Sequence, residues 1–173
     1  MADYKEKNAT YALNSYTWKL VEANLGWAKW KGVPPIIPVQ QQPEIMQSGK
    51  AFIVYGSAIH QPGHLYQHKK EAVSYMVYAP TATEVNRIVN LLSDTFERQD
   101  VAAEDVNNWL VTEADGRGSH RGVYFTSIKT TMSQKAEDPS DEEAGYFAGL
   151  VLVEMNYTTD TPNIVTSGFT YTS

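Results

Sequence analysis

The sequence predicts an α+β fold in which a mostly antiparallel sheet of about four strands carries a long amphipathic helix and an N-terminal helix. Residues 81–96 combine a helix-capping pattern with an apolar stripe at helical spacing. Two extended apolar segments precede this helix and two follow it, and the short turn HQPGH separates the first two. Because 173 residues are too few for two well-buried cores, we assign residues 1–158 to a single domain.

The long helix after Pro80 is the best-defined predicted element. Thr81-x-x-Glu84 is a capping-box pattern, in which side chains and backbone donors at a helix N-terminus satisfy one another. Its buried face is predicted to consist of five apolar residues at helical spacing: Val85, Ile88, Val89, Leu92 and Phe96. A first helix is predicted near residues 10–24, where apolar residues recur on one face, and a shorter third helix begins at Asp100.

Four segments are predicted as strands. Residues 51–59 and 64–79 are rich in β-branched and aromatic residues and form a hairpin around HQPGH. Residues 145–158 form the most apolar strand. Residues 122–132 alternate between two unlike faces, so Ile128 is expected to share a face with Tyr124, Thr126 and Thr130, opposite Val123, Phe125, Ser127 and Lys129.

Residues 33–50 form a proline-rich segment that we expect to run as a stiff, extended strap across a surface. Four prolines within ten residues exclude both a helix and a central strand: Pro34, Pro35, Pro38 and Pro43. A ligand for an SH3-type domain is an alternative, but the PxxP pattern with a flanking basic residue is only loosely met. The residues proposed for an interface here are Pro34, Pro35, Ile36 and Ile37.

Two further segments are expected to project from the domain. The connection over residues 133–144 is acidic and too long for a tight hairpin turn, and Asp138 and Asp141 are its candidate contact residues. Residues 159–173 form a C-terminal arm with more β-propensity than a loose end requires. The candidate contact residues of the arm are Ile164, Val165, Phe169 and Tyr171.

Composition excludes several classes of protein. A net charge of −6, with no cluster of lysine and arginine, argues against affinity that comes from neutralising nucleic-acid phosphates. The absence of cysteine removes disulfides and thiolate chemistry and fits a reducing compartment. No signal peptide or membrane span is recognised, so we expect a soluble protein made inside a cell. The 11 tyrosines and 4 tryptophans fit either an interface or a tyrosine-rich sheet surface.

A search for chemistry yields no predicted site. His64 and His68 lie about 13 Å apart in a predicted strand, too far to share a metal ion. The acidic connection does not have the spacing of an EF-hand, and Pro139 interrupts it. Neither a phosphate-binding glycine motif nor a nucleophile elbow is present. The sequence therefore predicts a protein that is not an enzyme, with no catalytic residue, cofactor or metal.

A resemblance to a known family adds to this interpretation. VSYMVYAPTATEVNRIVNLLSDTF, residues 73–96, followed by GYFAGLVLVEMNY, resembles the tail terminator or tail-completion proteins of long-tailed bacteriophages. The pattern covers residues 51–158 without a diagnostic motif, and the proline-rich strap and threonine-rich tail depart from the simplest members. The resemblance implies a small fold of a sheet with helices against it, assembled into a hexameric ring. Such a ring caps the tail tube and joins it to the head connector.

The resemblance also implies partners and a location. The expected partners are copies of the chain itself, a tail tube protein, a connector or neck protein and, in a contractile tail, a sheath. DNA would pass through the ring without specific binding, and the protein would lie at the head-proximal end of the virion tail after synthesis in the host cytoplasm. The C-terminal arm is expected to add a strand to a neighbouring chain. A connector or neck role, and a cellular scaffold or adaptor, remain open.

An alternative of another class is a small enzyme or ligand-binding domain. It would use tyrosines and one of His60, His64 or His68 around a cleft. Particle size distinguishes the two classes, since a ring protein assembles and a small enzyme of this length stays a monomer or dimer.

Overall fold

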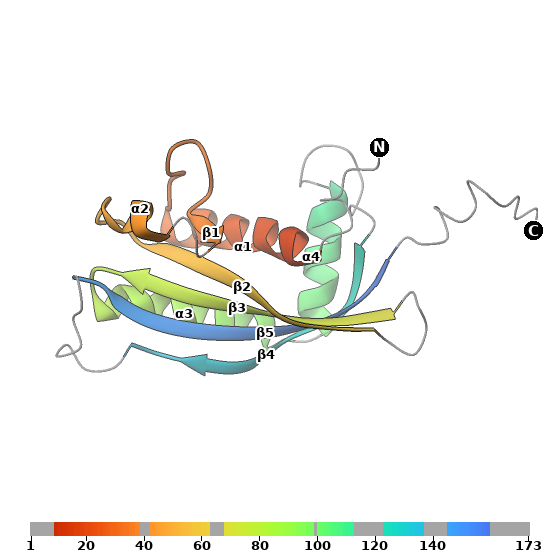
Figure 1. Cartoon of the computed structure of the whole chain (residues 1–173). Helices are drawn as coiled ribbons and strands as arrows, with labels where there is room; N and C mark the ends of the chain where they lie inside the picture. Colours follow the sequence, from red (N-terminus) through yellow and green to blue (C-terminus); the bar gives the residue numbers. More distant parts are fainter. Residues whose placement is uncertain are drawn as a thin grey trace, which may run out of the picture.

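The computed structural model describes residues 9–38, 42–62, 68–98, 100–112, 123–136 and 145–159. These residues form a five-stranded sheet in the order β1-β2-β3-β5-β4 (Figure 1). The strands are β1 (Ile36–Pro38), β2 (Phe52–Pro62), β3 (His68–Ala79), β4 (Val123–Gln134) and β5 (Phe147–Thr159). Every neighbouring pair is antiparallel except β1 and β2, which are parallel. The α+β class and the mostly antiparallel sheet are thus confirmed, with one short strand more than predicted.

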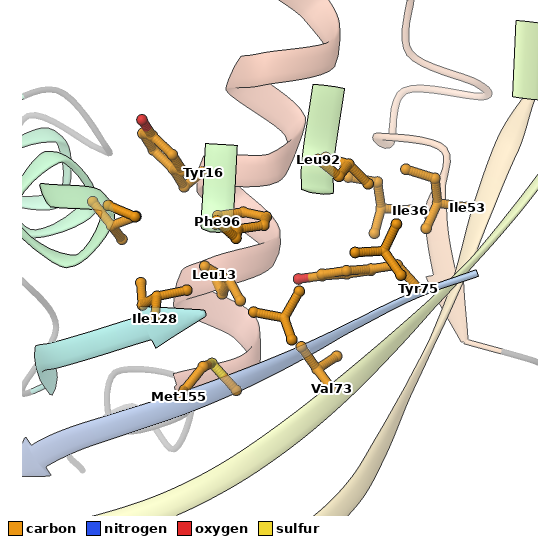
Figure 2. Packing of buried hydrophobic residues seen from close by; sticks show 14 of the residues in the cluster. Leu13, Tyr16, Ile36, Ile53, Val73, Tyr75, Leu92, Phe96, Ile128 and Met155 are labelled. Carbon is orange, nitrogen blue, oxygen red and sulfur yellow. The ribbon is translucent and has the colours of Figure 1, made fainter. Parts of the chain in front are cut away.

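Three helices pack on the same face of the sheet. They are α1 (Ala9–Leu25), α3 (Ala82–Phe96) and α4 (Asp100–Thr112), as Figures 1 and 2 show. Alternate residues of the two central strands are buried beneath them, among them Val73 and Val77 of β3 and Val151 and Val153 of β5. Burying apolar area at about 25 cal/mol per Å² is the main favourable term in such a layer. In the described residues, no helix is long and apolar enough to cross a membrane.

Helix α3 has the predicted start and the predicted buried face. The Thr81 hydroxyl accepts a hydrogen bond from the Glu84 backbone N–H at 3.2 Å, as a capping residue should. All five residues of the predicted stripe are buried: Val85, Ile88, Val89, Leu92 and Phe96. The helix lies so close to β5 that a Cβ on Gly149 would be 2.8 Å from Val85 and 2.7 Å from Val89. A residue without a side chain is therefore required at position 149.

Helix α1 is joined to β3 by polar contacts as well as apolar ones. The Tyr75 hydroxyl, buried beneath α1, donates to Asn14 Oδ1 at 2.7 Å. Glu71 accepts hydrogen bonds from the hydroxyls of Thr10 at 2.7 Å and Tyr157 at 2.9 Å. These bonds satisfy polar groups at the helix-sheet boundary that would otherwise be costly to bury.

The proline-rich segment is not extended throughout, which corrects the prediction. It contains β1 and a five-residue helix, α2 (Gln42–Met46), so the exclusion of a helix was wrong. Pro43 lies in the first turn of α2, where a missing N–H breaks no intrahelical bond. Pro38 ends β1, a short strand at the edge of the sheet, where proline is tolerated.

Strand β4 contains two bulges that the alternating pattern did not predict. The extra residues are Thr126 and Thr131, where the register with β5 shifts. Each bulge moves the following residues to the other face. Ile128 is consequently buried on the helix side with Val123 and Phe125, and its predicted place beside Tyr124 was wrong.

The hairpin of β2 and β3 is confirmed, but its turn lies further along the chain than predicted. Gln61 and Pro62 of the predicted turn instead pair with Lys70 and Lys69 of β3, and residues 63–67 lie outside the described part of the chain.

Candidate functional site

The sheet face opposite the helices is the candidate site, and we call its exposed portion the open face. It consists of side chains that alternate with the buried ones: Lys70, Ala72, Ser74 and Met76 of β3, Leu150, Leu152, Glu154 and Asn156 of β5, and Ser127, Lys129 and Met132 of β4. These side chains are half-buried or exposed, in contrast to their fully buried neighbours on the helix side. The sequence therefore buries one face and leaves much of the other accessible.

A second, smaller core covers this face at the β1 and β2 end of the sheet, and Met76 and Tyr78 of β3 pack against it. Ile37, Ile45, Phe52, Val54 and Tyr146 are buried together there, beneath the proline-rich segment. Rings of Phe52 and Tyr78 stack with centroids 5.0 Å apart, and the Tyr146 hydroxyl donates to the Lys50 carbonyl at 3.1 Å. The segment thus packs on its own sheet and leaves the β5 and β4 side of the face uncovered by it.

The centre of the open face is apolar. Met76, Leu150 and Leu152 are half-buried, and Met132 is 48% exposed. Paired residues across the strands share a face, so Leu152 lies between Ser74 and Met132 in one row. Contiguous apolar area of this kind on a sheet is typical of a contact surface.

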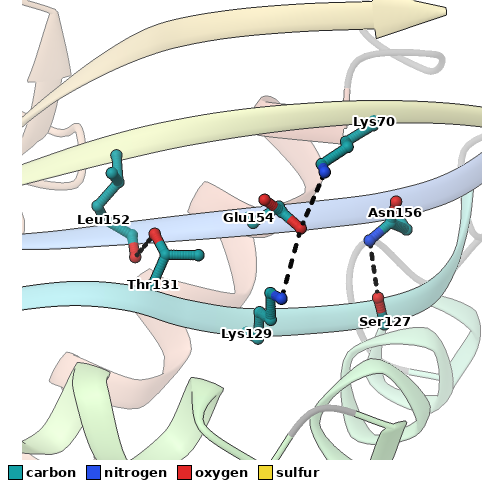
Figure 3. A network of polar contacts seen from close by, with 7 residues as sticks. All are labelled: Lys70, Ser127, Lys129, Thr131, Leu152, Glu154 and Asn156. Atoms are coloured by element: carbon teal, nitrogen blue, oxygen red, sulfur yellow. Dashed lines mark hydrogen bonds and ion pairs between the residues drawn. The ribbon is translucent and has the colours of Figure 1, made fainter.

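A row of charges borders the apolar centre (Figure 3). Glu154 lies between two lysines, at 3.5 Å from the Nζ of Lys70 and 3.8 Å from that of Lys129. The two lysine side chains are nearly half exposed, whereas that of Glu154 is 20% exposed. Two lysines against one glutamate give this row a net charge of +1, although the whole chain carries −6.

Strand β4, at the end of the sheet, is already engaged by polar side chains. The hydroxyls of Thr126 and Thr131 donate to the β5 carbonyls of Asn156 at 3.1 Å and Leu152 at 3.2 Å. The side-chain amide of Asn107 on α4 bonds both the N–H and the C=O of Phe125, at 2.9 and 2.8 Å. Bulges and such bonds are the means by which edge strands avoid pairing with another strand.

The outer side of α3 and α4 is the opposite surface of the molecule, and we call it the helix surface. Among the described side chains of residues 82–110 it carries five carboxylates and two arginines, a net charge of −3: Glu84, Asp94, Glu97, Glu104, Asp105, Arg87 and Arg98. Arg98 pairs with Asp105 at 2.9 Å. Val101 contributes an apolar side chain that is 49% exposed.

A pocket of about 390 Å³ lies beside the start of α3. Its lining residues are Trp27, Ala28, Pro35, Gly49, Lys50, Ala51, Pro80 and Glu84. Lys50 and Glu84 are the charged groups in this lining. His68 lies at the opposite end of β3 from Pro80, so it is not part of the pocket.

Two tyrosines beneath the helices have raised pKa values. Burial raises the pKa of Tyr75 above its usual range. Burial and the neighbouring Glu71 carboxylate together raise the pKa of Tyr157. The Tyr75 hydroxyl donates to Asn14 of α1 and the Tyr157 hydroxyl donates to Glu71 of β3, and neither lines the pocket or the open face.

The predicted contact residues fall into two groups. Pro35, Ile36 and Ile37 are buried within the chain and Pro34 is half-buried, so these apolar side chains are largely covered without a partner. The others lie outside the described residues: Asp138, Asp141, Ile164, Val165, Phe169 and Tyr171. His64 and His120 also lie outside them, and no group of three His, Asp or Glu side chains in the described residues could hold a metal ion.

Sequence reasoning missed the charged row of the open face. One signal was present, since Glu154 and Asn156 alternate with apolar residues in the most apolar strand, which marks a face away from the core. Their pairing with Lys70 and Lys129 depends on strand register, which is a property of the folded sheet.

A scan against protein-family models gives no match for this chain, and a search of curated proteins finds no matching sequence.

Proposed function

We propose that the protein is a structural component of a bacteriophage virion, a tail terminator that forms a ring, caps the tail tube and joins it to the head connector. Two features support the proposal. The segment that carries the resemblance folds as β3, α3 and β5, in the order expected for a sheet with a long helix against it. The chain also presents two unlike surfaces, the open face and the helix surface, which a subunit of a closed ring needs.

The open face is the single observation that carries the proposal. Within the described residues, three helices cover one side of the sheet and the second core covers the β1 end of the other side, which leaves apolar area exposed next to a charged row. Such area is typical of proteins that act by contact with other proteins. In the proposed ring the further partners are the tail tube protein, the connector or neck protein and, in a contractile tail, the sheath, while DNA passes through the channel.

The test is the size and shape of the purified particle. Light scattering should give the mass of several copies of the 19.4 kDa chain, six in the proposed ring, and negative-stain microscopy should show rings that cap purified tail tubes. A single 19.4 kDa species at all concentrations tested would contradict the ring. Rings that bind the connector but not the tube would assign the protein to the neck instead.

The pocket beside α3 favours one alternative, a small ligand-binding domain. Its volume lies within the range of sites for small molecules, and Trp27 offers an aromatic wall with Lys50 and Glu84 as polar groups. A fluorescence screen using the tryptophans as reporters tests this alternative. Saturable quenching by a small molecule, lost in Trp27→Leu, together with a monomeric particle would favour it over the ring.

A further inference from the structure

We propose that the open face of one copy packs on the helix surface of the next copy, so that the contact between copies is heterologous. This inference rests on the proposed ring and names the two surfaces that would meet in it. A heterologous contact uses different patches on the two partners and closes into a ring when its rotation divides a full turn. The occupant of the open face is therefore a second copy of this chain.

Charge complementarity is the first argument. The charged row of the open face has a net charge of +1 and the helix surface has −3, so the two surfaces attract each other across a contact between copies. Two open faces brought together would oppose +1 to +1. Two helix surfaces brought together would oppose −3 to −3. Of these three arrangements, the heterologous one joins surfaces of opposite net charge.

The size of the surface is the second argument. Strands lie about 4.8 Å apart and rise about 3.3 Å per residue, so the three strands of the open face over six residues cover roughly 300 Å², with the charged row included. Contiguous apolar patches of roughly 300 to 600 Å² on soluble proteins are often functional contact sites. Met132 and Val101, which are 48% and 49% exposed, supply an apolar side chain to each surface.

The bulges and side-chain bonds of β4 favour a contact through the open face of the sheet over pairing of another strand along the β4 edge. Bulges at Thr126 and Thr131 interrupt the strand, and Asn107 occupies the backbone of Phe125. Addition of a neighbouring strand along this edge would break these bonds. A contact through the face leaves all of them in place.

Charge reversal and complementation test the contact. Lys70→Glu with Lys129→Glu reverses the open face, and Asp94→Lys with Glu104→Lys reverses the helix surface. Each double variant alone should assemble at least about tenfold more weakly than the unmodified chain in light scattering at low salt, because like charges then meet. An equimolar mixture of the two should regain assembly, since each variant then presents a surface complementary to the other.

Lys31→Glu is the matched control. Lys31 also pairs with a glutamate, Glu44 of the proline-rich segment, and neither residue belongs to the two surfaces. This variant should assemble as the unmodified chain does. Met132→Asp is a second open-face variant that leaves the ion pairs intact and should also weaken assembly, with its fold checked by circular dichroism.

The outcomes separate this inference from the proposed function. Rings that persist in both double variants, or a mixture that fails to regain assembly, overturn the heterologous contact and leave the ring itself standing. Deletion of residues 160–173 is a second comparison. If this deletion abolishes assembly while both charge variants still assemble, the contact belongs to the C-terminal arm and the inference is overturned. An unmodified chain that stays a 19.4 kDa monomer overturns both the ring and the contact.

Discussion

The two faces of β5 differ although they belong to the same thirteen residues. Val153 and Met155 point toward the helices and are fully buried. The neighbouring residues Leu152 and Glu154 point to the open face and are half-buried. Both faces carry apolar side chains, but in the described part of the chain helices close only one of them. The apolar residues on the open face therefore need a different explanation from those of the core. Contact with another chain supplies one.

Truncation of one apolar side chain on each face should change the free energy of unfolding by very different amounts. Phe96→Ala on the helix side should lower the free energy of unfolding by about 3–5 kcal/mol, because it leaves a cavity beside Tyr16 in a closed core. Met132→Ala on the open face should change it by no more than about 0.5 kcal/mol. Urea unfolding at one protein concentration measures both. Equal losses would mean that the open face contributes to folding as a core does.

The sequence predicted those features of the two faces that depend on residues close together in the chain. Thr81 and the stripe ending at Phe96 are local, since capping and helical spacing are fixed within a few turns, and both were predicted correctly. The bulges at Thr126 and Thr131 are not visible in an alternating pattern, because threonine fits a regular strand equally well. Because the bulge at Thr126 was not predicted, Ile128 was assigned to the wrong face of the sheet.

The prediction for the proline-rich segment was wrong, and the charged row was not predicted, for different reasons. A rule that treats every proline as a helix breaker overlooks the first helical turn, where Pro43 lies. The row around Glu154 joins three strands that are distant in the sequence, so neither lysine can be assigned to it before the register is known.

A glycine on the helix side gives the next largest effect. Gly149→Ala places a Cβ 2.7 to 2.8 Å from Val89 and Val85, and the helix must shift to make room. Overpacking of this kind should cost about 1–3 kcal/mol in a thermal or urea unfolding experiment. Ala148→Ser, one residue earlier and exposed, is the matched control and should stay within about 0.5 kcal/mol. A neutral Gly149→Ala would mean that α3 does not lie this close to β5.

A smaller effect should appear only at high pH. The pKa of Tyr157 is raised in the fold by burial and by Glu71, so the folded state retains a proton that the unfolded state releases. This contribution to stability is fully present below pH 10, the usual tyrosine pKa, and is lost as the pH rises above it. Tyr157→Phe should therefore show a shallower loss of stability above pH 10. An unchanged slope in urea unfolding across pH 8 to 11 would contradict this account.

Replacement of Lys129 on the open face should change folding stability least. Lys129→Met removes one member of the charged row, whose Nζ lies 3.8 Å from Glu154 in a partly exposed pair. Exposed ion pairs contribute about 0.2–1 kcal/mol, and a long apolar side chain keeps the packing of the lysine stem, so the free energy of unfolding should change by less than about 0.5 kcal/mol. Unfolding of the monomer and light scattering of the assembly should be measured on the same variant. A loss of assembly without a loss of folding stability would mean that the row serves contacts between chains, whereas a loss above about 1 kcal/mol would place it among the groups that hold the sheet together.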